Sequence, residues 1–183
     1  MAMARTLLRN KPYSPLLNTR FEKLPDTYLD DYFHRSALWC IFPSFFNGDY
    51  FEDGVWKTTR FFDIPELCER VRPLYRQFIP VLRRMFAAGW EPVTYAEATP
   101  AEVRVERYGP RDGGDVLFAV FNPGKETVEA RITIDAAAIL LPPELSADTL
   151  VVPRELPVSR LGDEVTVTVP VAAGRCEVVR LAL

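Results

Sequence analysis

Histidine and cysteine are scarce in this chain of 183 residues. His34 is the only histidine, so a nucleophilic triad with a histidine base, or a multi-histidine metal site, has almost no residues to use. The three cysteines are odd in number and lie in separate segments, which favours reduced, buried thiols over a disulfide framework or a metal site. They are Cys40, Cys68 and Cys176.

A basic surface and a membrane-spanning run are also missing. The formal net charge is −3 and the arginines are scattered, which disfavours binding to nucleic acid or anionic lipid. Near the N-terminus Leu7 and Leu8 are the only apolar residues between Arg5 and Arg9, too short an apolar region for a signal peptide, and no later run approaches a membrane span. We therefore expect a cytoplasmic protein that binds neither nucleic acid nor membrane.

General-purpose catalytic and cofactor motifs are absent as well. No glycine-rich loop is followed by lysine and serine or threonine, as phosphate binding requires. Asp49, Glu52 and Asp53 lie close together, but they lack the alternating ligand spacing and the terminal glutamate of an EF-hand. The sequence therefore predicts no catalytic residue, no metal site and no cofactor.

The first part of the chain has helical periodicity interrupted by aromatic segments. The segment 26–37 places its apolar residues on one helical face, with acids in its first turns and basic residues near its end, so it is predicted to be a helix. Leu38–Phe42 is apolar without polar alternation, which predicts a fully buried strand. Residues 44–62 are predicted to form a long aromatic loop with two glycine-containing turns.

A second helical region begins at Asp63, a plausible N-terminal cap, and Pro65, a first-turn proline. Gly89 is predicted to end this region. Proline lacks the backbone N–H that a helix interior needs, so we expect a short helix, a new start near Pro73 and a kink near Pro80.

After residue 98 the apolar period changes to the alternation of strands. Val116–Phe121, the turn Asn122–Lys125 and the segment 127–134 together predict a hairpin. One sheet cannot bury all the apolar positions, so about six to eight strands are expected to form a sandwich. The remaining elements predicted are strands at 103–108, 150–152, 165–169 and 176–183, and a helical turn at 136–141.

Three segments carry a resemblance to a known family. Tyr13–Thr19, Ile41–Phe46 and Ala87–Ala96 resemble the last two units of glycoside-hydrolase-like (β/α)8 barrels of the α-galactosidase type, which precede a small antiparallel β-sandwich. Val120–Gly124 is similar to the second strand of such sandwiches. The resemblance implies an α+β, multidomain chain: a partial (β/α) barrel segment of about two βα units over residues 1–98, and an antiparallel β-sandwich over 102–183.

The resemblance also implies where catalysis resides. Glycoside hydrolysis ordinarily needs two carboxyl groups across the scissile bond, and in barrels of this type they sit on middle strands. Both would then lie before Met1. The chain is expected to be the C-terminal portion of a carbohydrate-active glycosidase-like protein, non-catalytic by itself.

A carbohydrate ligand would meet the residues that follow the two barrel strands, because barrel active sites form at the carboxyl ends of strands. Polar side chains there can hydrogen-bond sugar hydroxyls, and flat rings can stack on a sugar face. For each such residue the alternative is loop solvation or core packing. The predicted substrate-binding residues are Asn18, Arg20, Ser44, Phe46, Asn47, Asp49 and Trp56.

Two barrel units cannot close an eight-stranded barrel, so the sequence also predicts incomplete covering. Leu38–Phe42 and the apolar face over 67–86 would be partly exposed, and exposed apolar surface drives association. We expect an upstream chain that completes the barrel, or self-association. A sharply cooperative monomer would contradict this expectation.

Two other functions remain open at this point. The sandwich is alternatively a carbohydrate- or protein-binding module for which the helices serve as a docking segment. The chain is alternatively a complete small hydrolase that uses Asp49, Glu52 and Asp53.

Overall fold

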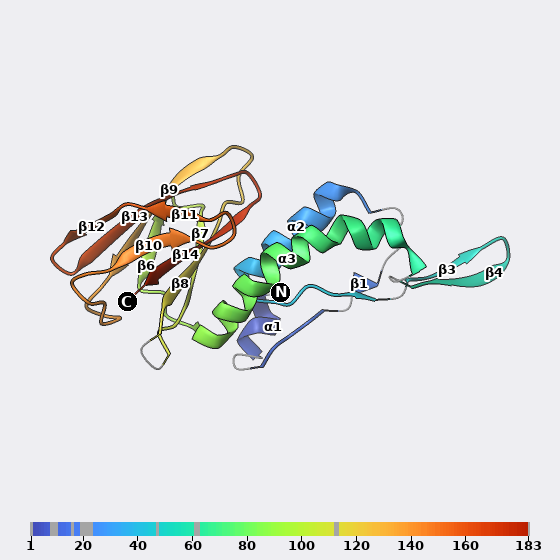
Figure 1. Ribbon diagram of the computed structural model, residues 1–183, viewed down its shortest axis with the longest axis horizontal. Coiled ribbons are helices and arrows are strands. Elements are labelled where there is room, and N and C mark those ends of the chain that lie inside the picture. Colours follow the sequence, from blue (N-terminus) through green and yellow to red (C-terminus); the bar gives the residue numbers. More distant parts are fainter. Residues whose placement is uncertain are drawn as a thin grey trace.

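A computed structural model shows three packed layers, with the sheets at the left of Figure 1, the two long helices beside them and a hairpin projecting at the right. The structure describes residues 2–7, 11–15, 17–18, 24–46, 48–60, 63–111 and 114–182. The helices are α1 (Ala2–Leu7), α2 (Asp26–Leu38) and α3 (Pro65–Ala88). Helix α2 contacts strands of the nearer sheet, and so does α3.

Ten strands form the two sheets of the sandwich, and they are paired antiparallel throughout. They are β5 (Trp90–Glu91), β6 (Ala96–Thr99), β7 (Arg104–Tyr108), β8 (Val116–Phe121), β9 (Val128–Asp135), β10 (Ser146–Thr149), β11 (Arg154–Leu156), β12 (Val158–Leu161), β13 (Glu164–Val171) and β14 (Cys176–Ala182). The six-stranded sheet has the order β11-β10-β14-β8-β7-β5, and the four-stranded sheet has the order β12-β13-β9-β6.

This arrangement confirms the predicted antiparallel sandwich. Eight of the strands, β7 to β14, lie within residues 102–183, as expected. Strands β5 and β6 also belong to the two sheets, so the strands of the sandwich begin at Trp90. The division at residues 98 and 102 stays a prediction.

Strand β8 is buried along its whole length because both faces of its sheet are covered. Val116, Phe118 and Val120 face the core between the two sheets. Leu117, Ala119 and Phe121 pack instead with residues of α2 and α3. A strand covered on both faces reads as a continuous apolar run, which explains why this segment lacks polar alternation.

The predicted hairpin over residues 116–134 is wrong. Strand β8 belongs to the six-stranded sheet and β9 to the four-stranded sheet, so the connection crosses between the layers. The buried side chain of Asn122 fixes this corner by donating to the carbonyls of Glu126 and Val171, at 2.7 and 3.0 Å, and by accepting the Gly124 N–H. The turn signal is genuine, but local sequence does not specify the sheet that the next strand joins.

The strand predicted at 150–152 is also wrong, because these residues form the turn between β10 and β11. Thr149 Oγ1 holds the turn by donating to the carbonyl of Val152 at 2.6 Å. The strands predicted at 165–169 and 176–183 are confirmed within β13 and β14 as far as the described residues extend. Hydrogen-bonded turns occupy 136–140, where a helical turn was predicted.

Helix α2 confirms the first predicted helix, but the buried strand predicted over Leu38–Phe42 is wrong. Leu38 completes the helix, and the chain then reverses at Cys40, whose φ is 47°. The Cys40 N–H donates to the Ala37 carbonyl and the Ile41 N–H to the Ser36 carbonyl, which is the Schellman pattern that closes a helix. Glycine usually occupies the left-handed position at a helix end, and this segment has a cysteine there. The sequence therefore lacks the usual signal for the end of the helix.

Helix α3 runs without a break through Pro73 and Pro80, so the predicted new start near Pro73 is wrong. Both prolines lie on the exposed side of the helix, where carbonyls without a helical partner can bind water. Pro65 and Gly89 bound the helix as predicted, whereas Ile64, not Asp63, is the N-terminal cap residue.

Two short strands, β1 (Leu17–Asn18) and β2 (Phe45–Phe46), pair parallel and are connected through α2. The Phe42 N–H donates to the Tyr13 carbonyl at 2.9 Å and thereby extends the alignment of the two segments. Within the described residues these strands pair only with each other. A β–α–β unit is therefore present, whereas its membership of a barrel stays a prediction.

The segment 44–62, predicted to be a loop, contains β2 and a hairpin of β3 (Gly48–Glu52) and β4 (Val55–Thr59). Asp53 and Gly54 connect these strands with φ values of 54° and 77°. Positive φ at both positions is the type I′ geometry that Asp-Gly favours in two-residue hairpins. The sequence signal predicted the turn, but the hairpin was missed.

The covering of the helices differs from the expectation of exposed apolar surface. On α3, Val71, Phe78, Leu82 and Met85 are all buried. Phe78, Leu82 and Met85 cluster with residues of α2 and of the six-stranded sheet, and Val71 clusters with Leu29 of α2. No helix in the described part of the chain is long and apolar enough to cross a membrane.

No disulfide joins the three cysteines, all of which lie in the described part of the chain, in agreement with the predicted reduced thiols. Cys176 is buried, whereas Cys40 and Cys68 are half-buried. Burial raises the pKa of the Cys176 thiol well above its usual value, which keeps it protonated and unreactive.

Candidate functional site

The carboxyl ends of β1 and β2 lie at the same edge because the strands are parallel. Asn18 and Phe46, both predicted substrate-binding residues, are register partners at these ends. Arg20 and Asn47, which follow them, lie outside the described residues. The structure therefore brings the backbones of two predicted site residues together.

Ser44, another predicted site residue, holds the chain in place just before β2. Its hydroxyl donates to the carbonyl of Pro15, its N–H donates to the hydroxyl of Tyr32 at 3.0 Å, and its carbonyl accepts that hydroxyl at 3.2 Å. Burial raises the pKa of Tyr32, so this phenol stays protonated and able to donate. Ser44 thus fixes the β–α–β unit in the isolated chain.

The ring of Phe45 points into the helical core. Its centroid lies 5.8 Å from that of Tyr32 and 6.3 Å from that of Tyr75. Tyr75 in turn donates to the Pro43 carbonyl, and burial raises its pKa to about 12. This side of β2 is therefore core.

Asp49 and Trp56, the remaining predicted site residues, lie on the β3–β4 hairpin. Phe51 and Trp56 are cross-strand partners whose ring centroids are 5.5 Å apart at an interplanar angle of 61°. Both rings face solvent, with exposed fractions of 61% for Phe51 and 72% for Trp56. Strand β3 begins two residues after β2 ends, so the hairpin that holds Phe51 and Trp56 follows the carboxyl end of the parallel pair in the chain. Figure 1 shows this hairpin projecting from the rest of the molecule.

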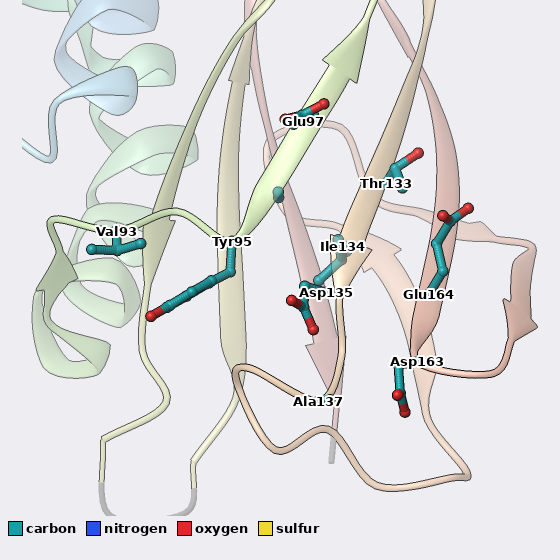
Figure 2. Close-up of a pocket in the computed structure, with 10 residues that line it drawn as sticks. Val93, Tyr95, Glu97, Thr133, Ile134, Asp135, Ala137, Asp163 and Glu164 are labelled. Carbon is teal, nitrogen blue, oxygen red and sulfur yellow. The ribbon is translucent and has the colours of Figure 1, made fainter.

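A cavity of about 700 Å³ lies elsewhere, on the four-stranded sheet. Figure 2 shows Glu97, Asp135, Asp163 and Glu164 around it, with Tyr95 to one side. The carboxylates point in different directions, and the part of the chain that the structure describes holds no acid, histidine or cysteine cluster suited to a metal ion. This cavity offers hydrogen-bond acceptors, without the convergence that metal binding needs.

A second cavity, of about 440 Å³, lies where the helices meet the sandwich. His34 on α2 and Glu177 on β14 line it. Arg175, which also lines it, forms ion pairs with the carboxylates of Asp30 at 2.5 Å and Asp31 at 3.1 Å. With its Nε2 protonated, His34 accepts the Cys176 N–H on Nδ1 at 3.1 Å. These contacts fasten α2 to the start of β14.

The His34 imidazole should have a pKa below its usual value of 6.5, because burial disfavours its charged form and Arg175 adds to that effect. An NMR titration reads this residue directly, since it is the only histidine. Arg175→Gln is expected to raise the pKa towards 6.5, whereas Arg154→Gln, a change on the same cavity wall, should leave it unchanged. A wild-type pKa at or above 6.5 would contradict the described junction.

Comparisons with known proteins bear on the fold. No family model matches the chain, and no curated protein matches it significantly. Over its whole length, however, the structure is similar to the maltogenic α-amylase AmyB from Thermotoga neapolitana, with a TM-score of 0.56, 14% identity and 44% of that chain covered. The chain has the fold of part of a glycoside hydrolase.

Two more solved structures match at lower similarity. A GH27 β-L-arabinopyranosidase from Geobacillus stearothermophilus has a TM-score of 0.48 and 10% identity, over 88% of this chain and 31% of the enzyme. α-Galactosidase I from Mortierella vinacea has a TM-score of 0.44 and 11% identity, over 91% of this chain and 38% of the enzyme. The chain thus spans less than half the length of each of the three.

Sequence reasoning missed the cavity residues. Glu97, Asp135 and Glu164 come from β6, β9 and β13, and Tyr95 lies just before β6. They meet only through the pairing of β9 with β6 and β13. Each is an ordinary polar residue in its own segment, so no local signal identifies them. Phe51, by contrast, could have been paired with Trp56 from the Asp-Gly turn, which fixes their register.

Proposed function

We propose that this chain is the C-terminal portion of a carbohydrate-active glycosidase-like protein and is non-catalytic by itself. In this proposal β1, α2 and β2 are the end of a partial (β/α) barrel, α3 is its last helix, and the sandwich is the tail that stabilises it. The catalytic carboxylates come from strands outside the described residues.

The observation that carries the proposal is the two-stranded parallel sheet. Parallel sheets are ordinarily larger and covered on both faces, and a pair of two-residue strands is too small to be stable alone. Within the described residues, β1 and β2 have no further strand partner at either edge. Additional parallel strands beside them would supply the missing hydrogen bonds, and the full-length fold match to part of a glycoside hydrolase supports this completion.

The proposed ligand of the completed site is a carbohydrate. Asn18, Arg20, Phe46 and Asn47 would stand at the carboxyl edge of the completed sheet, where barrel enzymes bind their substrates. Asp49 and Trp56 would reach the ligand from the hairpin. Ser44 takes a positioning part in this proposal, because its polar groups already bind Pro15 and Tyr32.

The test is assembly with the missing strands. The coding sequence upstream of Met1 is translated and coexpressed with the chain, and we expect it to encode parallel barrel strands and to copurify in an equimolar complex. The isolated chain should not hydrolyse 4-nitrophenyl α-galactoside or α-glucoside above the buffer rate. Turnover by the isolated chain that Asp49→Ala abolishes and Thr58→Ala preserves would overturn the proposal.

The cavity on the four-stranded sheet favours a second candidate function, a β-sandwich module that binds carbohydrate. Four carboxylates accept hydrogen bonds there beside the half-exposed ring of Tyr95 (Figure 2). One ring face is partly occupied, since the Arg107 guanidinium lies 5.7 Å from its centroid. The assembly with barrel strands remains the better supported of the two.

A further inference from the structure

The exposed aromatic pair on the β3–β4 hairpin has no part in the described core. Phe51 and Trp56 belong to none of the apolar clusters formed by the described residues. The Asp53–Gly54 turn nevertheless fixes their register and holds the two rings together at the end of a projecting element. Single exposed hydrophobic residues are common in soluble proteins, but a positioned pair of large rings costs solvation and needs a reason.

The charge of the hairpin narrows the choice of ligand. Between Gly48 and Thr59 it carries three carboxylates (Asp49, Glu52, Asp53) and one ammonium (Lys57), a net charge of −2. The Asp53 side chain, at the turn itself, is 87% exposed. A carboxylate at the tip opposes insertion into a lipid layer, and two identical acidic tips repel each other.

The size of the aromatic pair also disfavours a protein partner. A large aromatic side chain buries about 150–250 Å² when it is covered, so two rings supply at most about 500 Å². A specific protein interface buries about 800 Å² on each partner. A small, flat ligand suits two rings better.

Lys57 is satisfied within the hairpin. Its ammonium lies 2.9 Å from the Glu52 carboxylate and 3.8 Å from that of Asp53. These contacts lie on the face opposite the rings, because residues 52 and 57 alternate with 51 and 56. By the same alternation the ring face also carries Thr58, two residues from Trp56, with Asp49 as its register partner. This face therefore combines aromatic surface with a hydroxyl and one acid, and suits an uncharged ligand that donates hydrogen bonds.

We propose that Phe51 and Trp56 form a stacking platform for a neutral oligosaccharide. The C–H face of a sugar ring stacks on Trp56, the more exposed ring, with Phe51 edge-on beside it, and sugar hydroxyls hydrogen-bond with polar groups of the ring face. The position supports this assignment, because the hairpin continues from the carboxyl end of β2. The inference deepens the proposed function by giving its carbohydrate a contact point within this chain.

The test is isothermal titration of the full chain with maltohexaose and with cellohexaose, two neutral hexasaccharides that differ in anomeric linkage. At least one should bind, and Trp56→Ala and Phe51→Ala should each weaken that binding by about tenfold. Trp56→Phe, which keeps a ring, should retain most of the affinity. Leu161→Ala serves as the matched control, because Leu161 is 83% exposed on β12, outside the hairpin.

The platform would be overturned if neither hexasaccharide binds, or if Trp56→Ala binds sugar as well as the wild type does. It would also be overturned if Trp56→Ala leaves sugar binding intact but abolishes self-association or binding to phosphatidylcholine vesicles. The assembly test uses no sugar, so the two proposals fail separately. If the chain assembles with the upstream product but binds neither hexasaccharide, only the platform proposal is overturned. If it binds sugar through Trp56 but assembles with nothing, only the proposed function is overturned.

Discussion

Replacing Phe33 with alanine should lower the free energy of unfolding by about 3–5 kcal/mol, the usual cost of deleting a fully buried phenyl ring. Phe33 is 0% exposed, and its ring centroid lies 5.0 Å from that of Tyr75 and 5.7 Å from that of Phe78. The cavity would open where α2, α3 and β2 meet. Denaturant unfolding followed by circular dichroism measures the loss.

Phe51→Ala is the matched control for this change, because it deletes the same ring from an exposed position. It should cost less than about 1 kcal/mol, since the ring is 61% exposed and packs against Trp56 on the same hairpin. Equal losses in the two variants would mean that the helices are not packed as described. The same Phe51→Ala protein then serves in the sugar titration as a folded variant.

Replacing Glu177 with alanine should destabilise the protein by about 2–4 kcal/mol, because it leaves buried backbone N–H groups without a hydrogen-bond acceptor. The carboxylate is 7% exposed and accepts the N–H groups of Val151 and Val178 at 2.9 and 3.0 Å, and that of Val152 at 3.2 Å. It thereby holds the β10–β11 turn against β14. Glu129→Ala, on the exposed side of β9, should change stability by less than about 0.5 kcal/mol.

The same group gives a pH dependence of defined sign. Burial raises the pKa of Glu177 above its usual value of 4.5, and the three N–H donors offset this only in part. The folded protein then holds the proton more tightly than the unfolded chain. The contribution to stability is full below pH 4.5 and is lost as the pH rises through the folded-state pKa. Glu177→Gln, which cannot ionise, should remove this decline; an unchanged profile in that variant would contradict the raised pKa.

Periodicity predicted the elements whose burial follows a single face. Helices α2 and α3 and strand β13 were predicted because each repeats its apolar residues at the period of its own backbone. Prediction failed where a residue acts against its usual preference. Cys40 takes the left-handed position that glycine normally fills, and Pro73 and Pro80 lie inside a helix whose packing outweighs their cost.

Prediction also failed where the fold depends on partners that are distant in sequence. The sequence predicts the turn after β8, but the sheet that β9 joins is determined by the tertiary fold. Asn122 is buried at the corner between the two sheets. The candidate site divides in the same way. The resemblance to a barrel assigned Asn18 and Phe46 to the ends of its two strands, and the structure pairs them there, whereas the cavity between Tyr95 and Glu164 depends on the pairing of strands within the four-stranded sheet.

The burial of β8 on both faces has a consequence for how this chain unfolds. The six-stranded sheet gives one face to the sandwich core and the other to the helices, through alternate residues of the same strand. Loss of either layer would expose Val116 and Phe118 or Leu117 and Phe121 to water and weaken the strand that both layers use. The layer of α2 and α3 and the sandwich should therefore stabilise each other through this strand, so that a protease or denaturant that releases one should weaken the other.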